Sequence, residues 1–178
     1  MWVQAKQFIN PKFLPTLSKY ILDVIVSTQG SQIKLVIIDL DNTTWGGVLS
    51  DDGIEGIQIG LSTPLSYAFL RFQQVLRFLK QRGLLLAICS KNNLENVLHV
   101  FENHPDIHLS KSDFVSIKAN YIDKVQNIVD IQKHLDIGFD SIVFLDDSPF
   151  KFVTKGAVAP IADIFFIKVL LLVITYIV

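Results

Sequence analysis

The stretch "KLVIIDLDNTTWGG", residues Lys34–Gly47, contains an apolar run that two acidic residues follow directly. The run Leu35–Ile38 is too short for a helix, and its continuous apolar pattern is typical of a strand buried on both faces of a parallel sheet. Asp39 and Asp41 come next, separated by Leu40. In open parallel sheets, ligands bind outside the carboxyl ends of the strands. We therefore expect the buried strand to hold these carboxylates rigidly at a binding edge.

Predicted helices and strands alternate after this stretch. Pro64 suits the first position of a helix, apolar residues then recur every three or four positions, and Gly83 ends the pattern. The apolar run Leu84–Ser90 predicts a second buried strand. The remaining expected elements are a helix capped by Asn92 or Asn93, a weaker strand over 113–118, a helix from about Asp123 to before Gly138, and a buried strand over 141–147. This alternation predicts an α/β fold in which helices flank a parallel sheet on both faces.

The segment 45–60 is rich in glycine with apolar residues interspersed, and it predicts a small β-hairpin flap. Asp41 and Ser90 are 49 positions apart, and Ser90 and Lys124 are 34 positions apart. Because an independent domain needs roughly 50 residues of its own, neither interval can hold a large cap domain beside its helix.

The composition favours a single domain. The chain has 178 residues, half of them hydrophobic, so it can bury a sizeable core. Its net charge of −1, from 16 Lys and Arg against 17 Asp and Glu, argues against nucleic acid as a partner. The single cysteine, Cys89, excludes an internal disulfide and fits a cytoplasmic location. Residues 1–32 show no signal-peptide pattern and are expected to form an N-terminal extension.

The segment 151–178 is unusually apolar. Within it, Ile161–Val178 carries only Asp163 and Lys168 as charges and is barely long enough to span a membrane. Lys168 would lie near the middle of such a span, where a charge costs about 2.5–3.5 kcal/mol. Membrane contact is therefore the less favoured interpretation. Two alternatives stay open: the segment forms a buried strand followed by a helix, or it is an extension that does not fold.

Six polar residues stand at the ends of the predicted elements: Asp39, Asp41, Ser90, Lys124, Asp146 and Asp147. Parallel strands bring their carboxyl ends to one edge, so we expect the four aspartates to lie together. Like charges about 4 Å apart repel by about 1–4 kcal/mol per pair, so a cation must offset them. Carboxylate oxygens suit Mg²⁺, which also keeps waters and substrate phosphate as ligands. Lys124 and Ser90 would bind phosphoryl oxygens.

In this arrangement Asp39 is a candidate nucleophile, and Asp41 is a candidate acid and base that protonates a leaving group and then activates water. Each motif alone has an ordinary structural explanation. "DLDNT" could form a turn or part of a calcium loop, and the "DD" pair could form a turn. Ser90 could cap a helix, and Lys124 could be a solvated helix residue. Their joint placement at strand ends favours catalysis.

The motifs "DLDNT", the Ser of "CSKN", the Lys of "ANYIDKVQNI" and "FLDDSP" resemble the four motifs of the haloacid dehalogenase (HAD) superfamily of aspartate-nucleophile phosphotransferases. Longer stretches, such as "DLDNTTWGGVLSDDGIEGIQIG" and "LDIGFDSIVFLDDSP", closely resemble its FkbH-like branch, of the subfamily III phosphatase type. The likeness covers roughly 33–150, the expected catalytic domain, and fades after Phe150. Thr44 stands where the family pattern usually has Leu, a change that we expect to be tolerated.

The resemblance implies a Rossmann-like HAD fold with Mg²⁺ as cofactor. The resemblance implies that Asp39 is the nucleophile, Asp41 the acid and base, and Lys124 the charge stabiliser. It implies phosphate binding by Thr43 and Ser90, and further substrate binding by Lys91 and Asn92. The implied metal ligands are Asp39, Asp41, Asp146 and Asp147. FkbH-like proteins are understood to dephosphorylate a glyceryl unit from 1,3-bisphosphoglycerate and load it onto the thiol of an acyl carrier protein in polyketide-type biosynthesis. The resemblance also makes Cys89 a candidate transient thioester carrier, although an apolar strand raises the pKa of a thiol.

Three functions follow from these observations. The first is a Mg²⁺-dependent phosphatase and glyceryl transferase that serves an acyl carrier protein. The second is a generic HAD phosphatase that acts on a small phosphate ester or a phosphoprotein. The third is a non-catalytic protein of the same fold that only binds a partner.

Overall fold

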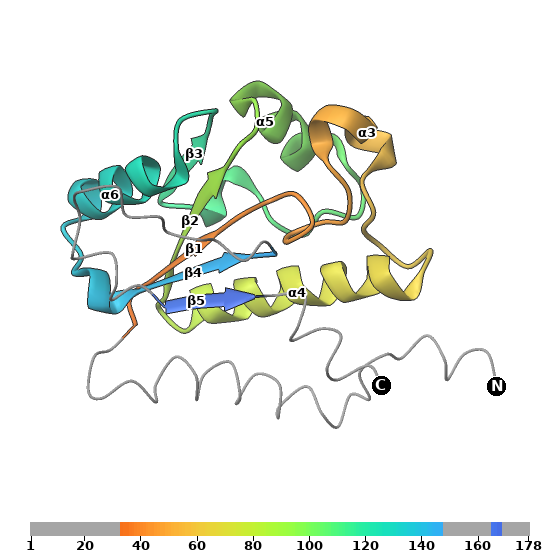
Figure 1. The fold of residues 1–178 in the computed structure, drawn as a ribbon. Coiled ribbons are helices and arrows are strands. Elements are labelled where there is room, and N and C mark those ends of the chain that lie inside the picture. The colour runs from red at the N-terminus through yellow and green to blue at the C-terminus, as the bar shows by residue number, and fades with distance from the viewer. Residues whose placement is uncertain (1–32, 148–164, 169–178) are drawn as a thin grey trace.

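A computed structural model of the chain describes residues 33–147 and 165–168. Its centre is a parallel sheet with the strand order β3-β2-β1-β4-β5 (Figure 1). The strands are β1 (Leu35–Ile38), β2 (Leu85–Ser90), β3 (Ser116–Ala119), β4 (Ile142–Asp146) and β5 (Phe165–Lys168). The helices are α3 (Leu49–Gly56), α4 (Pro64–Gln81), α5 (Leu94–Asn103) and α6 (Lys124–Leu135), with short 3₁₀ turns η2 (Lys111–Asp113) and η3 (Phe139–Ser141). The predicted parallel α/β fold is confirmed.

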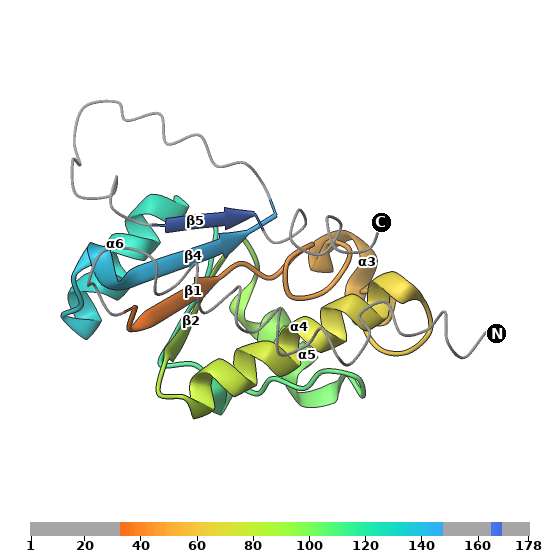
Figure 2. The ribbon, with the colours of Figure 1, turned by 90° about the horizontal axis from the view of Figure 1, so that it is seen from below.

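The central strand β1 is buried on both faces. Leu35 and Ile37 lie in one core cluster with residues of α6, whereas Val36 and Ile38 lie in another with residues of α4. Figure 2 shows α6 on one side of the sheet and α4 with α5 on the other. Each of these four side chains is at most 1% exposed, and full burial of such a side chain stabilises the fold by about 1.5–3 kcal/mol. The strand is therefore a rigid support for the residues that follow it.

Local signals account for the helix boundaries. Thr63 caps α4 by accepting a hydrogen bond from a first-turn backbone N–H, and Pro64 occupies the first helical position. Gly83 follows the end of α4 with a φ of 97°, a left-handed conformation that favours glycine. Asn93, rather than Asn92, caps α5, because its side chain accepts two first-turn N–H bonds.

The predicted hairpin flap is correct only at its two ends. Gly46 and Gln58 form an antiparallel bridge with backbone hydrogen bonds of 3.0 and 2.8 Å, but the helix α3 occupies the middle. The carboxylate of Asp52 accepts a hydrogen bond from the backbone N–H of Val48 at 2.7 Å, and acidic residues in the first turn favour a helix start. Within residues 33–147, neither interval between the motifs contains a separate cap domain.

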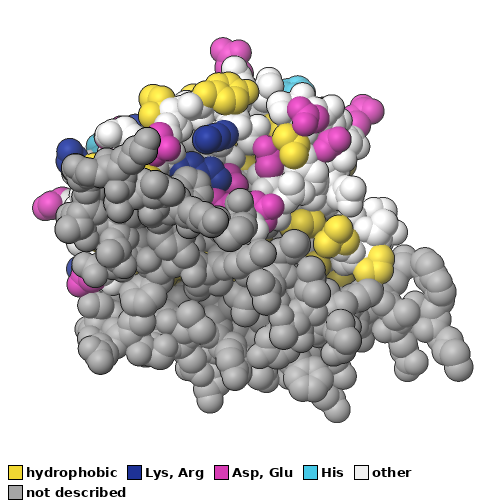
Figure 3. Space-filling view, viewed as in Figure 1, with side chains coloured by type: hydrophobic (Ala, Val, Ile, Leu, Met, Phe, Trp, Pro, Cys, Tyr) yellow, Lys and Arg dark blue, Asp and Glu magenta, His cyan; other side chains and the backbone are white. Residues whose placement is uncertain are grey.

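Four residues of the apolar C-terminal segment, Phe165–Lys168, form the edge strand β5 beside β4. The rest of the segment 151–178 and the predicted extension 1–32 lie outside the described residues. Among the helices that the structure describes, none combines the length and the apolarity needed to cross a membrane. Where Figure 3 shows the described surface, acidic, basic and apolar side chains are mixed.

A buried glutamine of α4 connects two loops. The side-chain amide of Gln73, which is fully buried, donates to the carbonyl oxygen of Thr44 at 3.1 Å. Its side-chain oxygen accepts from the backbone N–H groups of His108 at 2.9 Å and Leu109 at 3.3 Å. One side chain therefore satisfies three backbone groups and fixes the loop after β1 against the segment before η2.

We expect Gln73→Leu to lower the free energy of unfolding by about 3 kcal/mol, because the substitution keeps the volume but leaves three buried backbone groups without a partner. Urea denaturation measures this difference. Gln126→Leu, on the exposed face of α6, is the matched control and should change stability by less than about 0.5 kcal/mol. Equal effects of the two substitutions would contradict the role assigned to Gln73.

Candidate active site

The ammonium group of Lys124 lies between two carboxylates at the carboxyl edge of the sheet. Its Nζ donates to Oδ2 of Asp39 at 2.8 Å and to Oδ2 of Asp146 at 2.7 Å. Asp39 follows β1, Asp146 ends β4, and Lys124 begins α6, and all three are buried. Three elements that are distant in sequence thus meet in one buried ionic group, as the strand-end pattern predicted.

Burial and the neighbouring charges shift the pKa values of Asp39 and Lys124 in opposite directions. Burial raises the pKa of Asp39, and the charge of Lys124 with hydrogen bonds from Lys124 and Ser90 offsets only part of the rise. Burial alone would lower the pKa of Lys124, but the charge of Asp39 and hydrogen bonds to Asp146 and Asp39 outweigh it, so this pKa is raised. The lysine therefore stays protonated at neutral pH.

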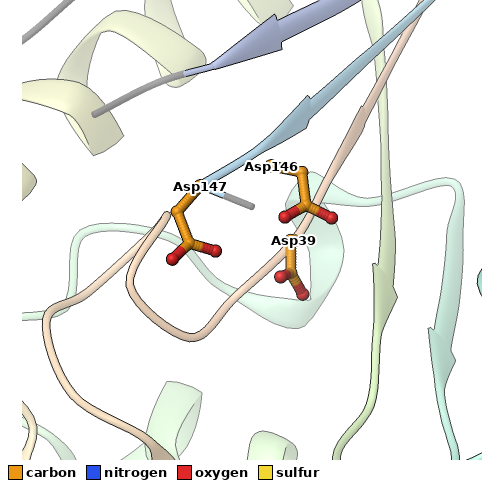
Figure 4. A group of neighbouring side chains, drawn as sticks. All are labelled: Asp39, Asp146 and Asp147. Carbon is orange, nitrogen blue, oxygen red and sulfur yellow. The ribbon is translucent and has the colours of Figure 1, made fainter. Parts of the chain in front are cut away.

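Asp147 completes an acidic cluster with Asp39 and Asp146. One carboxylate oxygen from each residue lies within 4.8 Å of the others, and Figure 4 shows the three side chains converging beyond the ends of β1 and β4. Burial, together with the charges of Asp146 and Asp39, raises the pKa of Asp147. Lys124 offsets one of the three negative charges, and a divalent cation would balance the other two. Carboxylate oxygens in this number suit a hard cation such as Mg²⁺.

Asp41 lies outside the group formed by Asp39, Asp146 and Asp147, and its predicted role as a metal ligand stays a prediction. Its Oδ1 accepts hydrogen bonds from the indole N–H of Trp45 at 3.0 Å and the backbone N–H of Leu49 at 3.1 Å. Its Oδ2 accepts one from the side-chain amide of Asn92 at 2.9 Å. The turn after β1, in which Asn42 has a left-handed φ of 53°, directs the carboxylate of Asp41 toward the flap.

The two threonines of the same turn bind the backbone of the site. The hydroxyl oxygen of Thr43 accepts from the backbone N–H of Asp147 at 3.0 Å. Thr43 is fully buried and positions Asp147, and its predicted contact with phosphate stays a prediction. The hydroxyl of Thr44 donates to the carbonyl oxygen of Asp39 at 2.7 Å, which explains how a threonine is accommodated where the family pattern has leucine.

Two of the three residues of the "SKN" segment lie within the site. The hydroxyl oxygen of Ser90 accepts a hydrogen bond from the side-chain amide of Asn92 at 3.1 Å. Ser90 and Asn92 are both buried. Lys91 is exposed, so the structure places it at the surface beside the site, and its predicted substrate contact stays a prediction.

Cys89 does not fit its predicted role as a thioester carrier. The side chain is 0% exposed and lies in the core cluster that includes Ile128 and Ile131 of α6. Its thiol donates to the carbonyl oxygen of Lys124 at 3.7 Å. Burial raises the pKa of this thiol to about 12, so the nucleophilic thiolate is scarce at neutral pH. Cys89 fills the core beneath the site.

Trp45 is a residue of the site that its position in the sequence did not predict. Its ring is fully buried and packs edge-on against Phe101, with 6.3 Å between ring centroids and 68° between planes. A tryptophan four positions after Asp41 looks like core packing, and no spacing rule predicts its hydrogen bond to that carboxylate.

The sequence matches no protein-family model and no curated protein. Among solved structures, the N-terminal part of BF1531 from Bacteroides fragilis, which contains a phosphatase domain and is complexed with Mg, is 41% identical to this chain with a TM-score of 0.73. The match covers 88% of this chain and 41% of that one. The fold is HAD-like. The chain spans less than half of the BF1531 fragment that it matches.

Two further structural neighbours are more distant. One is 3-deoxy-D-manno-octulosonate 8-phosphate phosphatase from Moraxella catarrhalis, in complex with a magnesium ion, a phosphate ion and KDO, at 24% identity, TM-score 0.43, and coverage of 71% of this chain and 63% of that one. The other is a HAD-superfamily hydrolase of subfamily IA from Geobacter sulfurreducens, at 13% identity, TM-score 0.42, and coverage of 68% and 81%.

We expect Cys89 to resist alkylation in the folded protein, because it is buried and its raised pKa keeps the thiol protonated. Mass spectrometry after iodoacetamide treatment at pH 8 should find the folded chain unmodified and the urea-unfolded chain fully modified. Cys89→Ala should keep at least about a third of wild-type phosphatase activity. Rapid labelling of the folded chain, or loss of activity in a folded Cys89→Ala protein, would restore the catalytic role.

Proposed function

We propose that the chain is a Mg²⁺-dependent phosphatase of the HAD type that uses Asp39 as its nucleophile. The observation that carries this proposal is the ammonium of Lys124 shared between Asp39 and Asp146 within the acidic cluster. The relative that is 41% identical supports the proposal, because its phosphatase domain is complexed with Mg.

The cation would be held by Asp39, Asp146 and Asp147, and it would supply positive charge to the oxygens of the transferred phosphoryl group. An oxygen of Asp39 forms a bond to phosphorus while the bond from phosphorus to the leaving oxygen breaks. Asp41 gives its proton to that oxygen. Asp41 then takes a proton from water, whose oxygen attacks phosphorus and releases phosphate from Asp39. Lys124 and Ser90 stabilise the charge on the phosphoryl oxygens.

Asp39→Asn should reduce hydrolysis of 4-nitrophenyl phosphate by about a thousandfold or more, because an amide cannot act as the nucleophile. Steady-state kinetics with Mg²⁺ measures the loss, and circular dichroism checks that the nearly isosteric variant is folded. Asp130→Asn, on the surface of α6, is the control and should retain wild-type activity. Excess chelator should abolish turnover by the wild type. Activity of folded Asp39→Asn within tenfold of wild type would overturn the nucleophile assignment.

For the substrate, we propose 1,3-bisphosphoglycerate as donor and the thiol of an acyl carrier protein as acceptor. Support comes from the likeness of "DLDNTTWGGVLSDDGIEGIQIG" and "LDIGFDSIVFLDDSP" to the FkbH-like branch. Because Cys89 is buried, the carrier thiol itself loses its proton and attacks the acyl carbon of the donor. A carbon–sulfur bond forms while the bond from that carbon to the phosphate oxygen breaks, and inorganic phosphate leaves. The remaining phosphate ester is hydrolysed at Asp39.

Incubation with Mg²⁺, 1,3-bisphosphoglycerate and a panel of acyl carrier proteins should add a glyceryl group to a carrier, which intact-protein mass spectrometry detects. Asp39→Asn should leave the phosphorylated glyceryl group on the carrier or give no product. Carriers without the phosphopantetheine arm are the control and should gain no mass. If turnover of the donor is as fast without carriers and no carrier gains mass, a generic HAD phosphatase replaces this proposal.

A further inference from the structure

We propose that Trp45 and Asn92 are positioning residues that orient the carboxylate of Asp41 for proton transfer. The inference rests on the phosphatase function proposed above, because it concerns the acid and base of that reaction. It adds two residues that do not touch the reacting atoms and act through Asp41.

Both oxygens of the Asp41 carboxylate are held by hydrogen-bond donors. Oδ1 accepts from the indole N–H of Trp45 at 3.0 Å and the backbone N–H of Leu49 at 3.1 Å, and Oδ2 accepts from the amide of Asn92 at 2.9 Å. These donors come from the turn after β1, from the first residue of α3, and from the loop after β2. Rotation of the carboxylate about its Cβ–Cγ bond would break at least one of these hydrogen bonds.

The two side-chain donors are themselves fixed in place. Trp45 is 0% exposed and Asn92 is 2% exposed. The Trp45 ring lies in the core cluster with Leu49 and Phe69 and contacts the ring of Phe101. A buried indole N–H requires an acceptor, and Asp41 supplies it. Packing therefore fixes the donors, and the donors fix the carboxylate.

Asn92 also connects Asp41 to Ser90, the last residue of β2. Its side-chain amide donates to Oδ2 of Asp41 at 2.9 Å and to the hydroxyl oxygen of Ser90 at 3.1 Å. One buried amide therefore holds the carboxylate of the acid and the hydroxyl of Ser90 in fixed relative positions.

A loss of orientation should affect esters of weak acids most. When the phosphorus–oxygen bond breaks, its electron pair stays on the leaving oxygen, which takes the proton of Asp41. Phenol, with a pKa of about 10 like the tyrosine side chain, needs this proton more than the more acidic 4-nitrophenol does. A misplaced Asp41 therefore slows phenyl phosphate more than 4-nitrophenyl phosphate, whereas general damage to the site slows both equally.

The test measures kcat/KM for both esters in the full chain and in Trp45→Phe and Asn92→Ala. In each variant, the preference for 4-nitrophenyl phosphate over phenyl phosphate should rise about tenfold, part of the roughly 10²–10⁴-fold that a general acid contributes. Asp41→Asn alone should already show the larger preference. Adding Trp45→Phe to Asp41→Asn should change the preference by less than about twofold, because the carboxylate to be oriented is absent.

Phe72→Leu is the matched control, because Phe72 packs against a core cluster that contains neither Trp45 nor Asn92. It should lower the melting temperature and leave the preference between the two esters unchanged. Equal slowing of both esters in Trp45→Phe and Asn92→Ala, or the same effect of Trp45→Phe with and without Asp41, would overturn the positioning role alone. A wild type that hydrolyses neither ester would overturn the proposed function and this inference with it.

Discussion

The ammonium of Lys124 between the carboxylates of Asp39 and Asp146 is the interaction on which the rest of the site depends. Transfer of these charges out of water is costly, and only short, well-directed hydrogen bonds compensate for it. The distances of 2.8 and 2.7 Å meet that condition. Because a buried ionic group contributes little net stability compared with apolar packing, its place at the sheet edge is better explained by chemistry than by folding.

The register of the parallel sheet brings these charges together. Ile38 of β1 pairs with Leu145 of β4. The residues that follow this pair, Asp39 and Asp146, are therefore neighbours at the same edge of the sheet. The backbone N–H of Asp39 donates to the carbonyl oxygen of Leu145 at 2.9 Å and continues the ladder. A slip of one residue would turn Asp39 into the opposite face. Apolar burial of β1 on both faces, which excludes such a slip, therefore also determines the geometry of the site.

The residues that the sequence placed correctly are those at the ends of regular elements. Asp39, Ser90, Lys124 and Asp146 converge because the rule that parallel strands end at one edge converts sequence position into spatial position. The position of the Asp41 carboxylate did not follow from that rule. It depends on the left-handed backbone conformation of Asn42 and on hydrogen-bond donors such as Trp45 and Asn92. Burial of Cys89 follows from the apolar strand pattern over Leu84–Ser90 and from the packing of α6 against β2, whereas the thioester role came from the resemblance alone.

The difference between the predicted hairpin and the observed helix α3 has a consequence for Asp41. In a hairpin, the backbone N–H groups facing the partner strand are used in cross-strand hydrogen bonds. The first N–H groups of a helix have no partner within the helix, so the N–H of Leu49, the first residue of α3, is available to the Asp41 carboxylate. A short helix in the flap thus gives Asp41 a donor that the predicted hairpin would have used for its own pairing.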